Sequence, residues 1–136
     1  MLKKLIELGF EKAGEWVLND DDNLELMINK HSEKNKILYS FVVDGEIKYI
    51  GTTVRTFNQR MYNYNKPGSR QPTNLDKNSK LIKSLKDGKI VEIYLWYDRD
   101  PQKYNNLIDI NLAAGLEDSM IAEFECEWNK RGKNKR

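Results

Sequence analysis

The residue types that could support chemistry in this sequence are tyrosine, arginine and glutamate. The chain has one histidine, His31, in the polar connector HSEKNK, and one cysteine, Cys126. These two residues can build neither a histidine-based hydrolase site nor a zinc site. One cysteine also excludes a disulfide within the chain, so we expect a reducing, cytoplasmic setting. Hydrolytic chemistry here would have to use phenols, carboxylates and guanidinium groups.

Two tyrosines fall in ILYSFVVDGEIKYIG (37–51), where two apolar runs flank an Asp-Gly pair. This pattern is typical of a β-hairpin. A two-residue turn would point Tyr39 and Tyr49 to opposite faces, because side chains alternate along a strand. A three-residue loop over 43–45 sorts the apolar residues better and places Tyr39 directly opposite Tyr49. We expect that loop and two adjacent phenols; an aromatic pair that only packs is the alternative.

An arginine and a third tyrosine are predicted on one face of the next helix. Thr56 and Gln59 form an S/T-x-x-E/Q capping box, so the helix should begin there and run to about Tyr64, before Pro67. Arg60 and Tyr64 have i, i+4 spacing and share a face. Such a pair can grip a phosphate, the arginine through two parallel hydrogen bonds, or can be a stacked surface pair.

A glutamate is predicted in the apolar stripe of the last helix. This helix should begin near Asn111 and run to about Trp128, and Glu117, Ile121, Phe124 and Trp128 recur at helical spacing. A carboxylate that points inward needs a cation, a hydrogen-bond donor or a metal ion as its partner. A salt bridge at the rim of the core is the purely structural alternative.

The remaining pattern predicts an α+β fold. Residues 2–8 suit a short helix, and EWVLN and NLELMIN suit a second, smaller hairpin. SRQPTNLDKN (69–78) is predicted as a polar loop, followed by a helix capped by Asn78 or Ser79, a strand at 89–97 and the loop DRDPQKYNN. Hairpin, helix, helix, strand and helix are most economically arranged as a small three-stranded antiparallel or mixed sheet flanked by helices, with the N-terminal helix and extra hairpin added.

Length and charge limit the partners that the chain can have. Its 136 residues suit one compact domain, and a formal net charge of +2 does not indicate a polyanion partner. Basic residues are nevertheless segregated from acidic ones, so one face could bind a polyanion; solvated surface without a partner is the alternative. No apolar run approaches the ~20 residues that span a bilayer, so no membrane association is expected.

Taken together, these residues resemble the GIY-YIG nuclease family over roughly residues 36–130. ILY (37–39) matches the first motif, with Ile37 where glycine is usual, and YIG (49–51) matches the second without change. The side chains at the family's other positions are Arg60, Tyr64, Glu117 and Asn129. On this resemblance the chain divides into an N-terminal extension packed on the core (1–35), a nuclease domain (36–130) and a basic tail (131–136).

The resemblance implies a metal-dependent DNA endonuclease that hydrolyses phosphodiester bonds. One divalent cation per site, Mg²⁺ or Mn²⁺, would be held by Glu117 and the scissile phosphate. Tyr39 would be the general base, with its phenol pKa lowered from about 10 by Arg60 and the metal ion. The other implied catalytic residues are Tyr49 and Tyr64, which would position phosphate or water, and Asn129, which would hydrogen-bond within the site and help fix the last helix.

The same resemblance suggests which side chains contact DNA. The loop 69–78 and the lysine-bearing helix after it would lie along the nucleic-acid backbone, which gives affinity and little sequence information. Thr52 follows YIG directly, where many relatives have lysine, and Lys48 is the candidate to replace that charge. The expected DNA contacts are Lys48, Thr52, Arg55, Lys66, Arg70, Lys77 and Lys80.

The sequence leaves the biological role open. Residues 1–35 are too few for a separate DNA-binding module, which favours a self-contained restriction-type enzyme that cuts as a homodimer. A repair or mobile-element nuclease with a partner protein is the second role. Two other functions are a catalytically inactive nucleic-acid-binding module of the same fold, with salt-sensitive binding and no turnover, and a structural or protein-interaction domain that does not bind DNA.

Overall fold

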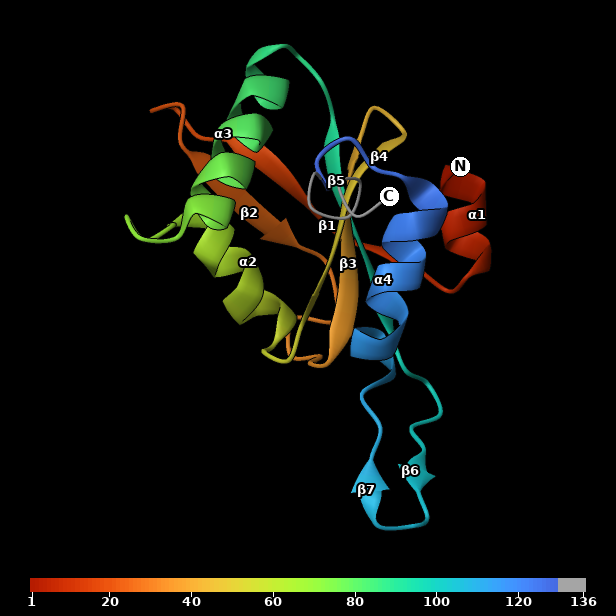
Figure 1. The fold of residues 1–136 in the computed structure, drawn as a ribbon. Helices are drawn as coiled ribbons and strands as arrows, with labels where there is room; N and C mark the ends of the chain where they lie inside the picture. Colours follow the sequence, from red (N-terminus) through yellow and green to blue (C-terminus); the bar gives the residue numbers. More distant parts are fainter. Residues whose placement is uncertain (130–136) are drawn as a thin grey trace.

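The computed structural model describes residues 1–129, and its central element is a five-stranded antiparallel sheet with strand order β2-β1-β5-β3-β4 (Figure 1). The strands are β1 (Glu11–Leu18), β2 (Leu24–Ile28), β3 (Ile37–Val43), β4 (Glu46–Thr53) and β5 (Val91–Tyr97). The helices are α1 (Leu2–Glu7), α2 (Phe57–Asn65), α3 (Pro72–Lys86) and α4 (Leu112–Phe124). No helix within residues 1–129 is long and apolar enough to cross a membrane.

The α+β class is confirmed, but the predicted three-stranded sheet is wrong. The N-terminal hairpin β1–β2 does not form a sheet of its own, because β1 pairs with β5 from Glu11↔Leu95 to Trp16↔Val91. Apart from Glu92, strand β5 is made of apolar and aromatic residues, and it is flanked by β1 and β3, as expected of a strand in the interior of a sheet. Residues 1–35 therefore contribute two strands to the main sheet, and the division of the chain at residue 35 remains a prediction.

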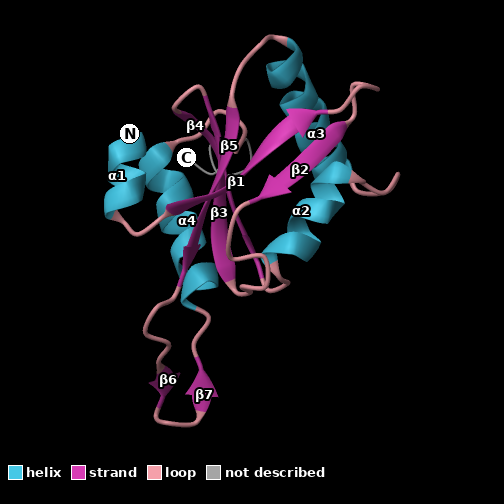
Figure 2. Ribbon diagram, turned by 180° about the vertical axis from the view of Figure 1, so that it is seen from behind, coloured by secondary structure: helices cyan, strands magenta, loops and turns pink. Residues whose placement is uncertain are grey.

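Helices cover both faces of the sheet. In Figure 1, α2 and α3 lie on one side, and α1 and α4 on the other; Figure 2 shows the same layers from behind. The strand β3 lies between these layers, so all its residues are buried. Tyr39 and Phe41 point into the core under α2 and α3, whereas Leu38 and Val42 point into the core under α1 and α4.

The turn between β3 and β4 differs from the predicted loop. Asp44 and Gly45 form a two-residue turn with φ values of +48° and +80°, and Val43 pairs with Glu46. Both positive φ values suit a type I′ turn, whose twist matches that of the flanking strands. The predicted three-residue loop over 43–45 is therefore wrong.

A β-bulge nevertheless brings the two hairpin tyrosines to one face. Phe41 pairs with Tyr49 and Val42 with Ile47, so Lys48 is the extra residue. Tyr39 consequently pairs with Gly51. The predicted three-residue loop would have paired it with Tyr49. The rings of Tyr39 and Tyr49 still lie side by side, with centroids 6.2 Å apart. The predicted proximity of the two phenols is confirmed, although its predicted cause is wrong.

The predicted helix boundaries are wrong where polar residues belong to a helix or end one. The capping box of α2 is confirmed, as is the start of α4 near Asn111, which is its N-cap. Helix α3 begins at Pro72, a residue favoured in the first helical turn, so the loop predicted over 69–78 is wrong. Helix α4 ends at Phe124, before Glu125 in the left-handed conformation, so the predicted stripe cannot continue to Trp128.

The buried face of α4 also differs from the predicted stripe. Its buried residues are Ala113 and Met120, while Glu117 lies beside this face and is half-buried. The loop predicted after β5 contains a small hairpin, β6 (Lys103–Tyr104) and β7 (Ile108–Asp109), which projects from the body of the molecule (Figure 1).

Candidate active site

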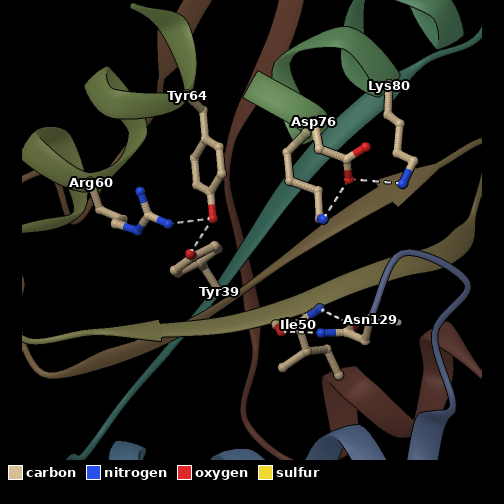
Figure 3. Close-up of polar contacts among 8 residues, drawn as sticks. Tyr39, Ile50, Arg60, Tyr64, Asp76, Lys80 and Asn129 are labelled. Atoms are coloured by element: carbon tan, nitrogen blue, oxygen red, sulfur yellow. Dashed lines mark hydrogen bonds and ion pairs between the residues drawn. The ribbon is translucent and has the colours of Figure 1, made fainter. Parts of the chain in front are cut away.

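A hydrogen-bonded chain of one arginine and two tyrosines lies between α2 and the sheet. The Arg60 Nη2 donates to the Tyr64 hydroxyl over 2.7 Å, and the hydroxyls of Tyr64 and Tyr39 lie 2.6 Å apart (Figure 3). Tyr39 and Tyr64 are fully buried, whereas Arg60 and Tyr49 are half-buried. Arg60 and Tyr64 thus share one face of α2, as predicted. This face points toward Tyr39, the tyrosine of the ILY motif.

Gly51 has a direct steric role beside Tyr39. A Cβ atom at position 51 would lie 2.6 Å from the Tyr39 hydroxyl oxygen and 2.7 Å from its ring carbon Cζ. Real Cβ atoms do not approach other atoms so closely, and Tyr39 is buried, so its ring would have to shift within a packed core. Gly51, the glycine of YIG, therefore leaves room for the Tyr39 side chain, which extends from β3 over β4.

We expect Gly51→Ala to disable this site without unfolding the protein. The added methyl group must displace the Tyr39 ring and with it the hydrogen bond to Tyr64. On the nuclease function expected from the sequence, DNA cleavage should fall by roughly a hundredfold, because small displacements of a catalytic group are that costly. Plasmid cleavage and thermal unfolding should be compared with Gly115→Ala, at an exposed position of α4 where a Cβ meets nothing within 4 Å. Wild-type cleavage by Gly51→Ala would show that the position of Tyr39 does not matter.

Helix α3 supplies residues that the sequence pattern did not indicate. The Arg60 Nη1 donates to Asn74 Oδ1 over 3.0 Å, and Asn74 Nδ2 donates to Gln71 Oε1 over 3.0 Å. Asn74 is buried, and it fixes the guanidinium plane from the side opposite Tyr64. Pro72 as a helix start would have indicated it, because Asn74, Lys77 and Leu81 then share one face.

The buried phenols are hard to ionise in the free protein. Burial raises the pKa of Tyr39, as does the neighbouring Tyr49, while the Arg60 charge and the hydrogen bond with Tyr64 oppose that rise. Burial likewise raises the pKa of Tyr64, and the pKa of Tyr49 is raised chiefly by burial and further by the charge of Glu117. At neutral pH all three hydroxyls are therefore protonated.

Glu117 reaches this cluster from the opposite layer of the fold. Helix α4 covers the face of the sheet that Tyr39 does not use, but it packs along the edge strand β4. The charge of Glu117 contributes to the raised pKa of Tyr49, so its carboxylate lies within electrostatic range of that phenol.

The residues at this edge fit a hard divalent cation that takes only some of its ligands from the protein. Within residues 1–129, no three His, Cys, Asp or Glu side chains gather closely enough to hold a metal ion. Glu117 can supply one carboxylate oxygen, and the other ligands would have to be phosphate and water oxygens. Mg²⁺ is commonly bound in this way, through one or two carboxylates and substrate phosphates.

Asn129 binds the backbone of β4 and does not touch the phenols. Its Oδ1 accepts from the Ile50 N–H and its Nδ2 donates to the Ile50 carbonyl, both over 2.9 Å (Figure 3). The Trp128 N–H adds a bond of 2.9 Å to the Lys48 carbonyl. The segment after α4 therefore pairs with the edge of β4 and holds the YIG residues in place, which is a positioning role.

The side chains predicted to contact DNA are dispersed. Arg55, Lys66 and Arg70 are exposed near the ends of α2 and before α3. Lys48 pairs with Glu46 and lies 3.6 Å from Glu127. Thr52 donates its hydroxyl to the Ile37 carbonyl over 2.8 Å and pairs with Leu38, which faces away from the tyrosines. Lys77 and Lys80 both pair with Asp76, and Lys77 lies over the Tyr49 ring.

The fold defined by these elements is that of the GIY-YIG nucleases. A solved mutant of bacteriophage T4 EndoII matches with a TM-score of 0.75 and 22% identity, over 94% of this chain and 98% of that one. The restriction endonuclease Hpy188I, solved in complex with product DNA, matches with a TM-score of 0.57 and 22% identity, over 89% of this chain and 76% of that one. Both are GIY-YIG nucleases, so the fold expected from the motifs is confirmed. No known family description and no curated protein sequence matched the chain.

Proposed function

We propose that this chain is a metal-dependent DNA endonuclease that hydrolyses phosphodiester bonds. The observation that carries the proposal is the chain Arg60–Tyr64–Tyr39 beside Gly51, in a fold shared with two endonucleases. A surface aromatic pair would not need buried phenols joined by hydrogen bonds of 2.6 and 2.7 Å. A buried network of this kind is costly unless every member is satisfied, and it is typical of sites that hold or move protons.

The hydrogen-bond chain supports Tyr39 as the general base. Arg60 donates to the Tyr64 oxygen, which leaves the Tyr64 proton free to be donated to the Tyr39 oxygen. Donors directed at an oxygen stabilise its ionised form, so this chain favours negative charge on Tyr39. Water would lose a proton to the Tyr39 phenolate and attack phosphorus, while the leaving oxygen departs with the bonding pair. A divalent cation at Glu117 supplies positive charge that offsets charge developing on the phosphate.

Arg60 and Tyr49 are the groups best placed to hold the phosphate itself. Both are half-buried and are therefore more accessible to a polyanion than Tyr39 and Tyr64, which are buried. A guanidinium group binds phosphate oxygens with two parallel hydrogen bonds. The neighbouring hydroxyl of Tyr49 would complete the cradle, and Asn129 would keep Tyr49 in position through the backbone of Ile50.

We further propose a restriction-type role and cutting as a homodimer. One relative in fold is a restriction endonuclease whose structure contains product DNA. Within residues 1–129 of this chain, strands β1 to β5 form a single sheet, with helices on its faces. These residues contain no separate unit for DNA binding. Two strands of DNA and one site per chain would then require two copies for a double-strand break.

The direct test is incubation of the pure protein with supercoiled plasmid and MgCl₂ or MnCl₂. We expect nicked and then linear DNA, and no reaction in EDTA. Tyr62→Phe is a suitable control variant, since Tyr62 is exposed on α2 beside the site and should cut like wild type. Absence of cutting with salt-sensitive DNA binding would identify the inactive binding module instead, and absence of both would leave a structural domain.

A further inference from the structure

Lys77 is a buried cation beside the phenols. The residue is 6% exposed, and its Nζ lies 4.9 Å from the centroid of the Tyr49 ring. Lysine is almost never buried unless its charge is compensated, because removing an ammonium group from water is costly. A lysine that only packed against Tyr49 would gain more from an apolar side chain of the same length. Its retained charge therefore requires an explanation.

The compensation that Lys77 receives within the described residues is shared. Asp76 Oδ2 lies 2.9 Å from Lys77 Nζ and 2.9 Å from Lys80 Nζ (Figure 3). The hydrogen bond from Lys77 lowers the pKa of Asp76 to about 2, so this carboxylate is ionised at any assay pH. Asp76 and its two lysines together therefore carry one excess positive charge, which suits an anion.

The position of Lys77 points to a particular anion. The Tyr49 ring contacts Lys77 and also the Tyr39 ring, whose centroid is 6.2 Å away, and the charge of Glu117 contributes to the raised pKa of Tyr49. A phosphate held at Tyr49 would thus meet Lys77, the general base and the carboxylate that binds the metal. The DNA backbone outside this site lies on the surface, where a buried ammonium group cannot reach it.

We propose that Lys77 is a catalytic residue that binds the scissile phosphate and exchanges Asp76 for a phosphate oxygen when DNA is bound. This role rests on the proposed nuclease function and goes beyond the backbone contact expected from the sequence. The charge of Lys77 then acts on the reacting group itself, together with Arg60. Asp76 holds the ammonium group in place in the free protein and retains Lys80 as its partner after the exchange.

The test separates the rate of cleavage from the affinity for DNA. In Lys77→Met, which keeps the packing and removes the charge, single-turnover cleavage at saturating DNA should fall by roughly a hundredfold, as for removal of one charge-stabilising donor. DNA affinity in Ca²⁺ should change by less than about tenfold, since one phosphate contact of many is lost. Lys77→Arg should restore part of the rate. Lys83→Met is the matched control on α3, at an exposed position paired with Asp87, and should cut normally.

Asp76→Asn provides a second variant if Lys77→Met does not fold. It keeps the ammonium group and removes the competing carboxylate, so DNA affinity should increase and the cleavage rate should be maintained. Lower affinity and lower rate in Asp76→Asn would overturn the exchange. If wild type cuts DNA and folded Lys77→Met cuts at the same rate, the catalytic role of Lys77 is wrong while the nuclease function stands. If wild type cuts no DNA, the proposed function fails and this role fails with it.

Discussion

Replacing Glu117 with glutamine should reduce plasmid cleavage by about a thousandfold or more. The change removes the carboxylate that the site can offer a divalent cation and replaces it with a neutral, weaker ligand. The side chain is half-buried on the flank of α4, so the fold should be retained. Time courses of nicking in MgCl₂, beside thermal unfolding, would measure both effects. Asp118→Asn changes the exposed neighbouring carboxylate and is the matched control.

A second readout of Glu117→Gln does not depend on activity. Burial raises the pKa of Tyr49 most and the Glu117 charge raises it further, so removal of that charge should lower this pKa. NMR titration of ¹³C-labelled tyrosines in the metal-free protein would detect this change. Equal cutting by wild type and Glu117→Gln would refute the metal-binding role, whereas an unchanged Tyr49 pKa would show that the carboxylate does not lie at the phenol cluster.

The local elements of the fold could be predicted because their causes lie within a few residues. The capping box of Thr56 and Gln59 marks the start of α2, and Asn111 marks the start of α4. The five-stranded sheet could not be predicted in the same way. It depends on the pairing of Glu11 with Leu95. These two residues are distant in sequence, and only the packing of the whole fold brings them together.

The hairpin shows how a correct conclusion can rest on a wrong register. Turn chemistry at Asp44-Gly45 favours two residues, and that register alone would separate Tyr39 from Tyr49. The bulge at Lys48 restores the alternation that brings both phenols to the same face. No glycine or proline marks this bulge in the sequence. It is stabilised from outside the hairpin, by the Trp128 N–H on the Lys48 carbonyl.

Residues of the candidate site could be predicted together where they lie on the same helix. Arg60 and Tyr64 follow from a single helical face. The sequence pattern does not indicate Asn74 or the buried position of Lys77, because it predicts a polar loop where both residues lie in α3. Glu117 was expected to point into the core, whereas it is half-buried on α4, which packs along the edge strand β4.

The edge of β4 is therefore the place where the two layers of the fold meet in one site. Tyr49 and Gly51 come from the strand itself, and Glu117 comes from α4 on the far face. Asn129 covers the backbone between Tyr49 and Gly51 by occupying both hydrogen-bonding groups of Ile50. An edge strand whose polar groups are already satisfied is held in one position and is protected from pairing with another chain.

Replacing Tyr39 with phenylalanine should have the other large effect, with a fall of about a hundredfold to ten-thousandfold in single-turnover cleavage, the range of general base catalysis. Burial raises the pKa of this phenol, so its ionised fraction in the free protein is small at neutral pH. Because the base form increases as pH rises toward that pKa, wild-type cleavage should increase by about tenfold per pH unit between roughly pH 6 and pH 8. Asp76 cannot cause this slope, since its pKa is about 2.

Tyr39→Phe should lose this pH slope together with the rate, because no ionising phenol remains at that position. The hydrogen bond with Tyr64 is also lost, so thermal unfolding must be measured alongside, with Tyr62→Phe on the exposed side of α2 as the control. A residual slope in Tyr39→Phe would assign the titrating group elsewhere, to Tyr49 or to water bound near Glu117. Full activity in Tyr39→Phe would mean that the buried chain from Arg60 only orders the site, and that Tyr49 is the phenol that meets the substrate.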